Sequence, residues 1–145
     1  MAYYLRSVGY QFIPYSTSSS TGSNAAMGEW NQYAGYWTET SVAAGATSTL
    51  YAFNTGGTKD VSIEATIQIL AGTEIETVKV LAHIVNTTVN YTTYGIIYSG
   101  ASSRWDIQAD YDAASTSLRL RIENTTVGSI ASPQANFQVM QVEAI

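Results

Sequence analysis

The segment that decides the fold lies near the end of the chain. It reads Trp105-Asp-Ile-Gln-Ala-Asp-Tyr-Asp112 and continues, after a short gap, as Ser117-Leu-Arg-Leu-Arg-Ile-Glu123. Both runs alternate apolar and polar residues with a period of two, which is typical of strands with one buried and one wet face. The run Phe137–Glu143 repeats the pattern. We therefore predict three C-terminal strands, the first two joined as a hairpin.

The side chains of this hairpin also predict its register. A four-residue loop at 112–115 gives the apolar pairs Ala109–Leu118, Ile107–Leu120 and Trp105–Ile122. The same register gives the charge pairs Asp106–Arg121 and Arg104–Glu123. An alternative register opposes Asp110 to Arg119. That register sets Asp106 directly against Glu123, and like charges directly opposite each other are unfavourable, so we prefer the first.

Earlier parts of the chain carry the same strand and turn signals. Apolar residues alternate in 61–69 and in 75–85, and shorter strand-like runs lie within 3–15, 49–53 and 94–98. Asn54-Thr-Gly-Gly57 and Ala71-Gly-Thr-Glu74 are turn signals. No segment of useful length has a helical period. Eight or nine strands with short connections predict an all-β fold, an antiparallel, jelly-roll-like β-sandwich.

The N-terminal part differs in composition from the rest. Ser16–Asn24 is a hydroxyl-rich, low-complexity run with nothing to bury. We predict that residues 1–24 comprise a first strand and a flexible Ser/Thr-rich segment, and that residues 25–145 form the sandwich. The flexible segment is either an exposed loop or a docking arm that orders on a partner.

Charge and composition limit the classes of partner. The 145 residues carry a net charge of -5 with only six Lys+Arg, which argues against nucleic acid and anionic membranes as partners. The N-terminus lacks the basic and apolar regions of an export signal, and no apolar run is long enough to span a membrane. Eleven Tyr and three Trp among many Ser, Thr, Gly and Asn suit contacts with protein or carbohydrate.

One aromatic cluster is the candidate binding site: Trp30, Tyr33, Tyr36 and Trp37. Large aromatic residues are often buried in a sandwich of this size, so we favour a place in the core or at a subunit interface. The alternative is a platform on which sugar rings stack.

We expect no catalytic group, metal or cofactor, and no enzymatic activity. His83 is the only histidine, and no partner for it is evident. The carboxylates Asp60, Glu74 and Glu76 lie in or beside turns with no sign of the shared cleft that a glycosidase needs. A local calcium ion at Asp110 and Asp112 is a minor alternative, because oxygen-only sites need several converging ligands.

The pattern of strands in this chain also carries a family resemblance. The resemblance rests on Trp30-Asn-Gln-Tyr33, Thr49-Leu-Tyr-Ala-Phe53, Trp105–Asp110, Leu118–Asn124 and the final strand 137–143. Over residues 28–145 the chain resembles the β-sandwich modules of tail-fibre, head-fibre and decoration proteins of tailed bacteriophages. The resemblance implies a non-enzymatic structural protein on the outside of a virion, often a homotrimer, bound to capsid or tail proteins.

A short chain of this family would be a capsid decoration protein, a head fibre or a tail accessory subunit. It would be made in the host cytoplasm and would attach through many weak contacts on a repeating lattice. We expect residues 1–24 to dock it. The alternative function is a carbohydrate-recognising receptor-binding domain of a tail fibre, with Trp30, Tyr33, Tyr36 and Trp37 against a host surface glycan.

Overall fold

The structure, a computed structural model, describes residues 2–7, 29–57 and 60–143. Its strands are β1 (Ala2–Ser7), β2 (Glu29–Thr38), β3 (Ser41–Val42), β4 (Thr47–Asn54), β5 (Val61–Ala71), β6 (Glu74–Val85), β7 (Thr88–Tyr98), β8 (Trp105–Asp112), β9 (Ser117–Asn124), β10 (Ile130–Ala131) and β11 (Gln134–Glu143). Without the two-residue strands β3 and β10, nine strands remain in this part of the chain, as the sequence predicts. The described residues contain no helix long and apolar enough to cross a membrane.

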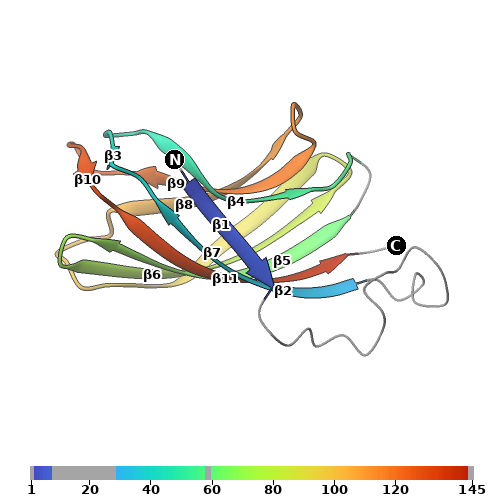
Figure 1. The fold of residues 1–145 in the computed structure, drawn as a ribbon, viewed down its shortest axis with the longest axis horizontal. Helices are drawn as coiled ribbons and strands as arrows, with labels where there is room; N and C mark the ends of the chain where they lie inside the picture. Colours follow the sequence, from blue (N-terminus) through green and yellow to red (C-terminus); the bar gives the residue numbers. More distant parts are fainter. Residues whose placement is uncertain (1, 8–28, 58–59, 144–145) are drawn as a thin grey trace.

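The strands form two facing layers (Figure 1). The larger sheet has the order β1-β2-β11-β5-β6-β7, and the smaller sheet has the order β4-β9-β8. The short strands β10 and β3 pair separately at one end. Every strand pair is antiparallel. The predicted all-β antiparallel sandwich is therefore confirmed.

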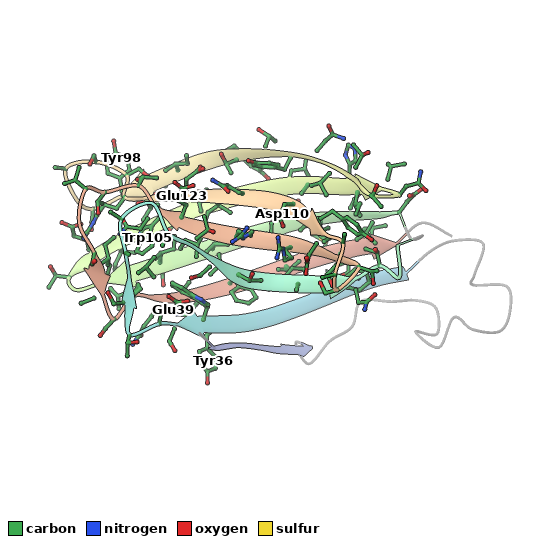
Figure 2. All side chains as sticks on the ribbon, turned by 90° about the horizontal axis from the view of Figure 1, so that it is seen from above. Tyr36, Glu39, Tyr98, Trp105, Asp110 and Glu123 are labelled. Carbon is green, nitrogen blue, oxygen red and sulfur yellow. The ribbon has the colours of Figure 1, made fainter. Side chains whose placement is uncertain are left out.

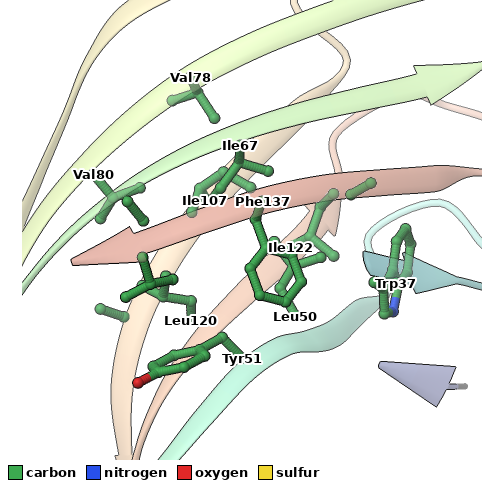
Figure 3. Close-up of a cluster of buried hydrophobic side chains, with 14 of the residues drawn as sticks. Trp37, Leu50, Tyr51, Ile67, Val78, Val80, Ile107, Leu120, Ile122 and Phe137 are labelled. Atoms are coloured by element: carbon green, nitrogen blue, oxygen red, sulfur yellow. The ribbon is translucent and has the colours of Figure 1, made fainter. Parts of the chain in front are cut away.

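The core lies between the two sheets (Figure 3). On β5 the alternate residues Val61, Ile63, Ala65, Ile67 and Ile69 are buried, and on β6 Val78, Val80, Ala82 and Ile84 are buried. Leu50, Ile107, Leu120 and Ile122 face them from the smaller sheet. Tyr51 and Phe137 meet edge to face with ring centroids 6.4 Å apart. The period-two faces that the sequence predicts are thus the faces that make the core.

The register of the β8–β9 hairpin differs from the prediction. Ile107 lies opposite Ile122, Ala109 opposite Leu120, and Asp110 opposite Arg119. The loop is 113–116 rather than 112–115. This is the alternative register with Asp110 opposite Arg119, and it is offset by two residues from the register that the sequence favours. An offset of two keeps each side chain on its predicted face, so the predicted burial holds although the predicted pairs are wrong.

Interactions beyond simple pairs explain why this register is stable. Asp106 does face Glu123. However, the side-chain amide of Gln108 lies beside them and donates to Asp106 Oδ2 at 3.0 Å and to Glu123 Oε2 at 2.6 Å. Arg119 meanwhile donates to both oxygens of Asp110 at 2.7 Å. One bridging amide and one bidentate ion pair together outweigh the carboxylate contact.

Two further connections bear on the sequence predictions. The turn after β4 contains Gly56 and Gly57, both with positive φ, but it joins the two sheets instead of closing a hairpin. It is held to the β8–β9 loop because the backbone N–H of Thr55 donates to the carbonyl of Thr116 at 2.9 Å. At the N-terminus, β1 pairs with β2 along its whole length, whereas Ser16–Asn24 lies outside the described residues.

Candidate functional surface: the β7 margin

β7 runs along one margin of the larger sheet, and β1 runs along the other (Figure 1). In the described part of the chain, β7 pairs with β6 alone, so its outer edge presents backbone N–H and C=O groups to solvent. The strand reads Thr-Val-Asn-Tyr-Thr-Thr-Tyr-Gly-Ile-Ile-Tyr and contains neither a charged residue nor a proline. Edge strands usually carry such residues because these discourage pairing with another chain.

The side chains of this strand are exposed on both of its faces. Tyr91, Tyr94, Ile96 and Tyr98 are each 41–46% exposed, and Ile97 is 70% exposed. Tyr91 lies opposite the buried Ala82, so it stands on the core side of the sheet. It remains exposed because the three-stranded layer is narrower than the six-stranded layer and does not cover this margin (Figure 2). We call β7 with these five side chains the β7 margin.

A bulge divides the strand. The ladder with β6 shifts register between the pairs Lys79–Tyr94 and Thr77–Ile97, so that β7 has two residues where β6 has one. Gly95 lies there with a φ of 62°, a conformation that favours glycine. Such a bulge increases the local twist, so Thr88–Tyr94 is the regular part of the edge.

The far end of the β7 margin continues into an apolar corner. Leu70 and Ile75 lie opposite each other beside the β5–β6 turn, and both are about two fifths exposed. Ile97 on β7 lies opposite Thr77, two residues from Ile75 on the same face of the sheet. These three aliphatic side chains form an exposed apolar group at this end of the β7 margin.

Behind the corner, a polar clamp holds the β7–β8 connection to β6. The buried carboxylate of Glu76 accepts hydrogen bonds from the Ser103 hydroxyl at 2.5 Å and from the Arg104 backbone N–H at 2.9 Å. Arg104 also pairs with Glu74 at 2.6 Å. The hollow beside these groups has a volume of about 10 Å³, so it has room for about one water and none for a sugar.

The outer face of the β8–β9 hairpin has the opposite character. Four of its charged side chains form what we call the arginine–aspartate face: Asp110, Asp112, Arg119 and Arg121. Arg119 binds Asp110 in a bidentate manner and lies 3.8 Å from Asp112, and Arg121 lies 3.3 Å from Asp110. The positive charges of this face are therefore used within the hairpin.

The electrostatics of the arginine–aspartate face follow from these contacts. Partial burial by itself would raise the pKa of Asp110, but the hydrogen bonds and charges of Arg119 and Arg121 outweigh it and lower that pKa. The Ser115 hydroxyl is the main cause of the lowered pKa of Asp112, and Arg119 adds to it. Both carboxylates are thus stabilised in their charged form.

The predicted aromatic site is not a single platform. Trp37 is fully buried and meets Trp105 edge to face at 6.5 Å, so it is a core residue that is not available to a sugar. Tyr36, its neighbour on β2, is 45% exposed and lies at the opposite margin from Tyr98 (Figure 2). Trp30 and Tyr33 lie on β2, with side chains outside the described residues.

The other candidates are held in local structural contacts. His83 is exposed, and its Nε2 lies 3.3 Å from the side-chain nitrogen of Asn90. The carboxylate of Asp60 accepts the backbone N–H of Asn86, 3.0 Å away. Among the described residues no three His, Cys, Asp or Glu side chains are grouped so as to hold a metal ion.

The sequence interpretation missed the β7 margin. It predicted a short strand-like run at 94–98 alone, whereas the structure has one strand from Thr88 to Tyr98. The usable signal was the run of eleven residues without charge or proline. The exposure of its core-side tyrosines could not be anticipated, because it depends on the width of the opposite sheet.

Comparisons with known proteins add one structural likeness. No protein-family model and no curated protein sequence matches the chain. Among solved structures it is similar to the crystal structure of the Acinetobacter phage vB_ApiP_P1 tailspike protein, with a TM-score of 0.49 and 14% sequence identity. The match covers 92% of this chain and 24% of the tailspike, so the chain spans about a quarter of that protein's length. The functional interpretation therefore depends on the residues described above.

Proposed function

We propose that this chain is a non-enzymatic structural protein of a bacteriophage virion that attaches to the particle exterior through protein–protein contacts. It would act as a capsid decoration protein, a head fibre or a tail accessory subunit. The sequence resemblance in the strands 105–110, 118–124 and 137–143 supports the virion assignment. Its partners would be capsid or tail proteins of the same particle and further copies of itself.

The β7 margin is the observation that carries the attachment mechanism. It combines a strand edge that has no neighbouring strand among the described residues with exposed Tyr and Ile side chains and no charge on the strand. Tyrosine and large aliphatic residues with little charge are typical of the centre of protein interfaces. The arginine–aspartate face, by contrast, satisfies its charges internally and offers few groups to a partner.

Attachment would be multivalent. One margin of this size makes only a modest contact, and identical copies on a repeating lattice raise the effective concentration of each further contact. The low positive charge of the chain supports a protein partner over nucleic acid or an anionic membrane.

The test is incorporation into particles. Ile97→Asp adds a charge to the β7 margin at a side chain that is already mostly exposed, so the fold is retained, and we expect at least a tenfold loss of the protein from purified virions. Val127→Asp, at a fully exposed loop residue, is the matched control and should be incorporated normally. Quantitative mass spectrometry of purified particles measures both variants and gives the copy number.

Two outcomes would contradict the proposal. Absence of the wild-type chain from purified virions would remove the virion assignment. Normal incorporation of Ile97→Asp, together with binding of the wild-type chain to a glycan array, would instead support the carbohydrate-recognising alternative and would place attachment elsewhere.

A further inference from the structure

We propose that two copies of this chain pair through the regular part of β7, residues Thr88–Tyr94, as antiparallel neighbours related by a two-fold axis at Tyr91. The larger sheets of the two copies would then form one continuous sheet. This inference rests on the proposed function, which names further copies of the chain as partners of the β7 margin. Its test needs only the purified chain.

The backbone of the strand supplies the interaction. In the described residues the outer edge of β7 has no neighbouring strand, and its ladder with β6 is regular from Thr88 to Tyr94. The bulge at Gly95 then twists the strand and ends the stretch to which another straight strand can pair. The middle residue of this seven-residue stretch is Tyr91, which fixes the position of the axis.

The side chains favour a second copy as the occupant. An axis at Tyr91 gives the pairs Tyr91–Tyr91, Asn90–Thr92, Val89–Thr93 and Thr88–Tyr94, and each keeps both residues on one face of the sheet. None of these pairs brings like charges together, although each copy has a net charge of -5. Aromatic and β-branched residues also make favourable cross-strand pairs.

Another sheet edge of the molecule shows the contrast. β8 is an edge strand of the smaller sheet and carries Asp106, Asp110 and Asp112 on its outer face. A second copy that paired there would bring rows of carboxylates together, and such charges are a common means of preventing edge-to-edge association. Self-pairing is therefore more favourable at β7 than at β8.

The expected pair is weak. A contact between two seven-residue strands and their neighbours is smaller than the roughly 800 Å² per partner of a stable interface. It should form reversibly at high protein concentration, and on a particle it would be reinforced by attachment of both copies to the same lattice. The trimer that the sequence resemblance implies would require a different arrangement.

Sedimentation velocity over a concentration series tests the pair. We expect the full chain to move from monomer to dimer as its concentration rises. Tyr91→Lys sets two lysines opposite each other at the axis, so it should weaken dimerisation about fivefold or more. Leu81→Lys is the control, because Leu81 is 49% exposed on the adjacent strand, against 45% for Tyr91, and should leave dimerisation unchanged. Far-UV circular dichroism checks that both variants are folded.

A complementation experiment tests the axis itself. Tyr91→Lys and Tyr91→Glu should each dimerise poorly alone, and a mixture should form heterodimers, because residue 91 of one copy faces residue 91 of the other. Failure of the mixture to associate overturns the position of the axis. A wild-type monomer at all concentrations, a trimer, or equal weakening by Leu81→Lys overturns the pairing. Virion incorporation is measured separately, so the proposed function can hold or fail independently.

Discussion

The outer face of the β8–β9 hairpin and the β7 margin are both solvent-facing parts of one sandwich, yet their side chains differ completely. The arginine–aspartate face carries two arginines and two carboxylates that bind each other. The β7 margin carries no charge and leaves Tyr and Ile side chains and a strand edge exposed. The charges of the first surface are paired with one another, whereas no described strand pairs with the outer edge of the second.

The difference between these two surfaces reflects where the few Lys and Arg side chains find their carboxylate partners. Of the six Lys+Arg, the four whose side chains are described all have carboxylate partners: Arg119 and Arg121 on the hairpin, Arg104 at Glu74, and Lys79 at Glu64. Their charges fix register and connections within the sandwich. In the attachment that we propose, recognition of a partner would be left to uncharged groups, and selectivity would come from shape and strand pairing.

Matched isoleucines on the two sides of this comparison should give the largest difference in stability. Ile122 is fully buried beneath the arginine–aspartate face, and its replacement by alanine should lower the free energy of unfolding by about 2–5 kcal/mol. Ile97→Ala on the β7 margin should change it by about 0.5 kcal/mol or less. Denaturant unfolding at low protein concentration measures both.

Such unfolding data could break the comparison. If Ile97→Ala were as costly as Ile122→Ala in a dilute, monomeric sample, then the β7 margin would be part of the core and not an exposed surface. A cost that grows with protein concentration would instead indicate that Ile97 becomes covered when copies associate.

The sequence predicted more of the hairpin side than of the β7 margin, for a physical reason. Burial of Trp105, Ile107, Leu120 and Ile122 follows from period two alone, whichever register is adopted. The register itself depends on Gln108, whose side-chain amide bridges the carboxylates of Asp106 and Glu123. A comparison of directly opposed residues does not include this third side chain. Local pattern therefore fixed the faces and left the pairing open.

The β7 margin could not be read in the same way. Period two places Tyr91 on the core side of its strand, where a large side chain is expected to be buried. Whether it is buried depends on how far the opposite sheet extends, and that sheet consists of β4, β9 and β8 from distant parts of the sequence. Likewise, the aromatic cluster at residues 30–37 was divided by strand alternation into a buried Trp37 and an exposed Tyr36.

A smaller effect should come from the ion pairs of the hairpin. Asp110→Asn removes the charge that binds Arg119 and Arg121, and should lower the free energy of unfolding by about 1 kcal/mol at neutral pH. Asp106→Asn on the same strand face relieves the opposition to Glu123 and should cost nothing. Denaturant unfolding of the two variants under identical conditions measures the contrast. An equal loss in both would mean that the pairing with arginine is not the source.

The pH dependence of stability in the wild type and in Asp110→Asn tests the same ion pairs. The pKa of folded Asp110 lies below its ordinary 3.8, so the charged carboxylate stabilises the folded state above about pH 4. This contribution is lost as the pH falls from about 4 through the lowered pKa. The wild-type chain should therefore lose stability more steeply in that range than Asp110→Asn does. Parallel curves for the two proteins would contradict this role for Asp110.

The smallest effect concerns a hydrogen bond between the β7 margin and a charged side chain. The Tyr94 hydroxyl donates to Glu64 Oε1 at 3.3 Å, and partial burial together with that carboxylate raises the pKa of Tyr94. Because the contact is exposed, Tyr94→Phe should leave the free energy of unfolding nearly unchanged. The ultraviolet titration difference between wild type and Tyr94→Phe isolates this tyrosine from the other ten, and its midpoint should lie above pH 10.

Glu64→Gln sharpens the result, because it removes the negative charge while keeping a hydrogen-bond acceptor beside the hydroxyl. We expect the midpoint of Tyr94 to move down toward 10 in this variant. If it stayed unchanged, burial alone would account for the raised pKa, and the β7 margin would be independent of the charges around it. In the wild type, a titration midpoint of Tyr94 that rises with protein concentration would show that this side chain becomes covered as copies associate. The Tyr94–Glu64 contact would then report on association through the β7 margin.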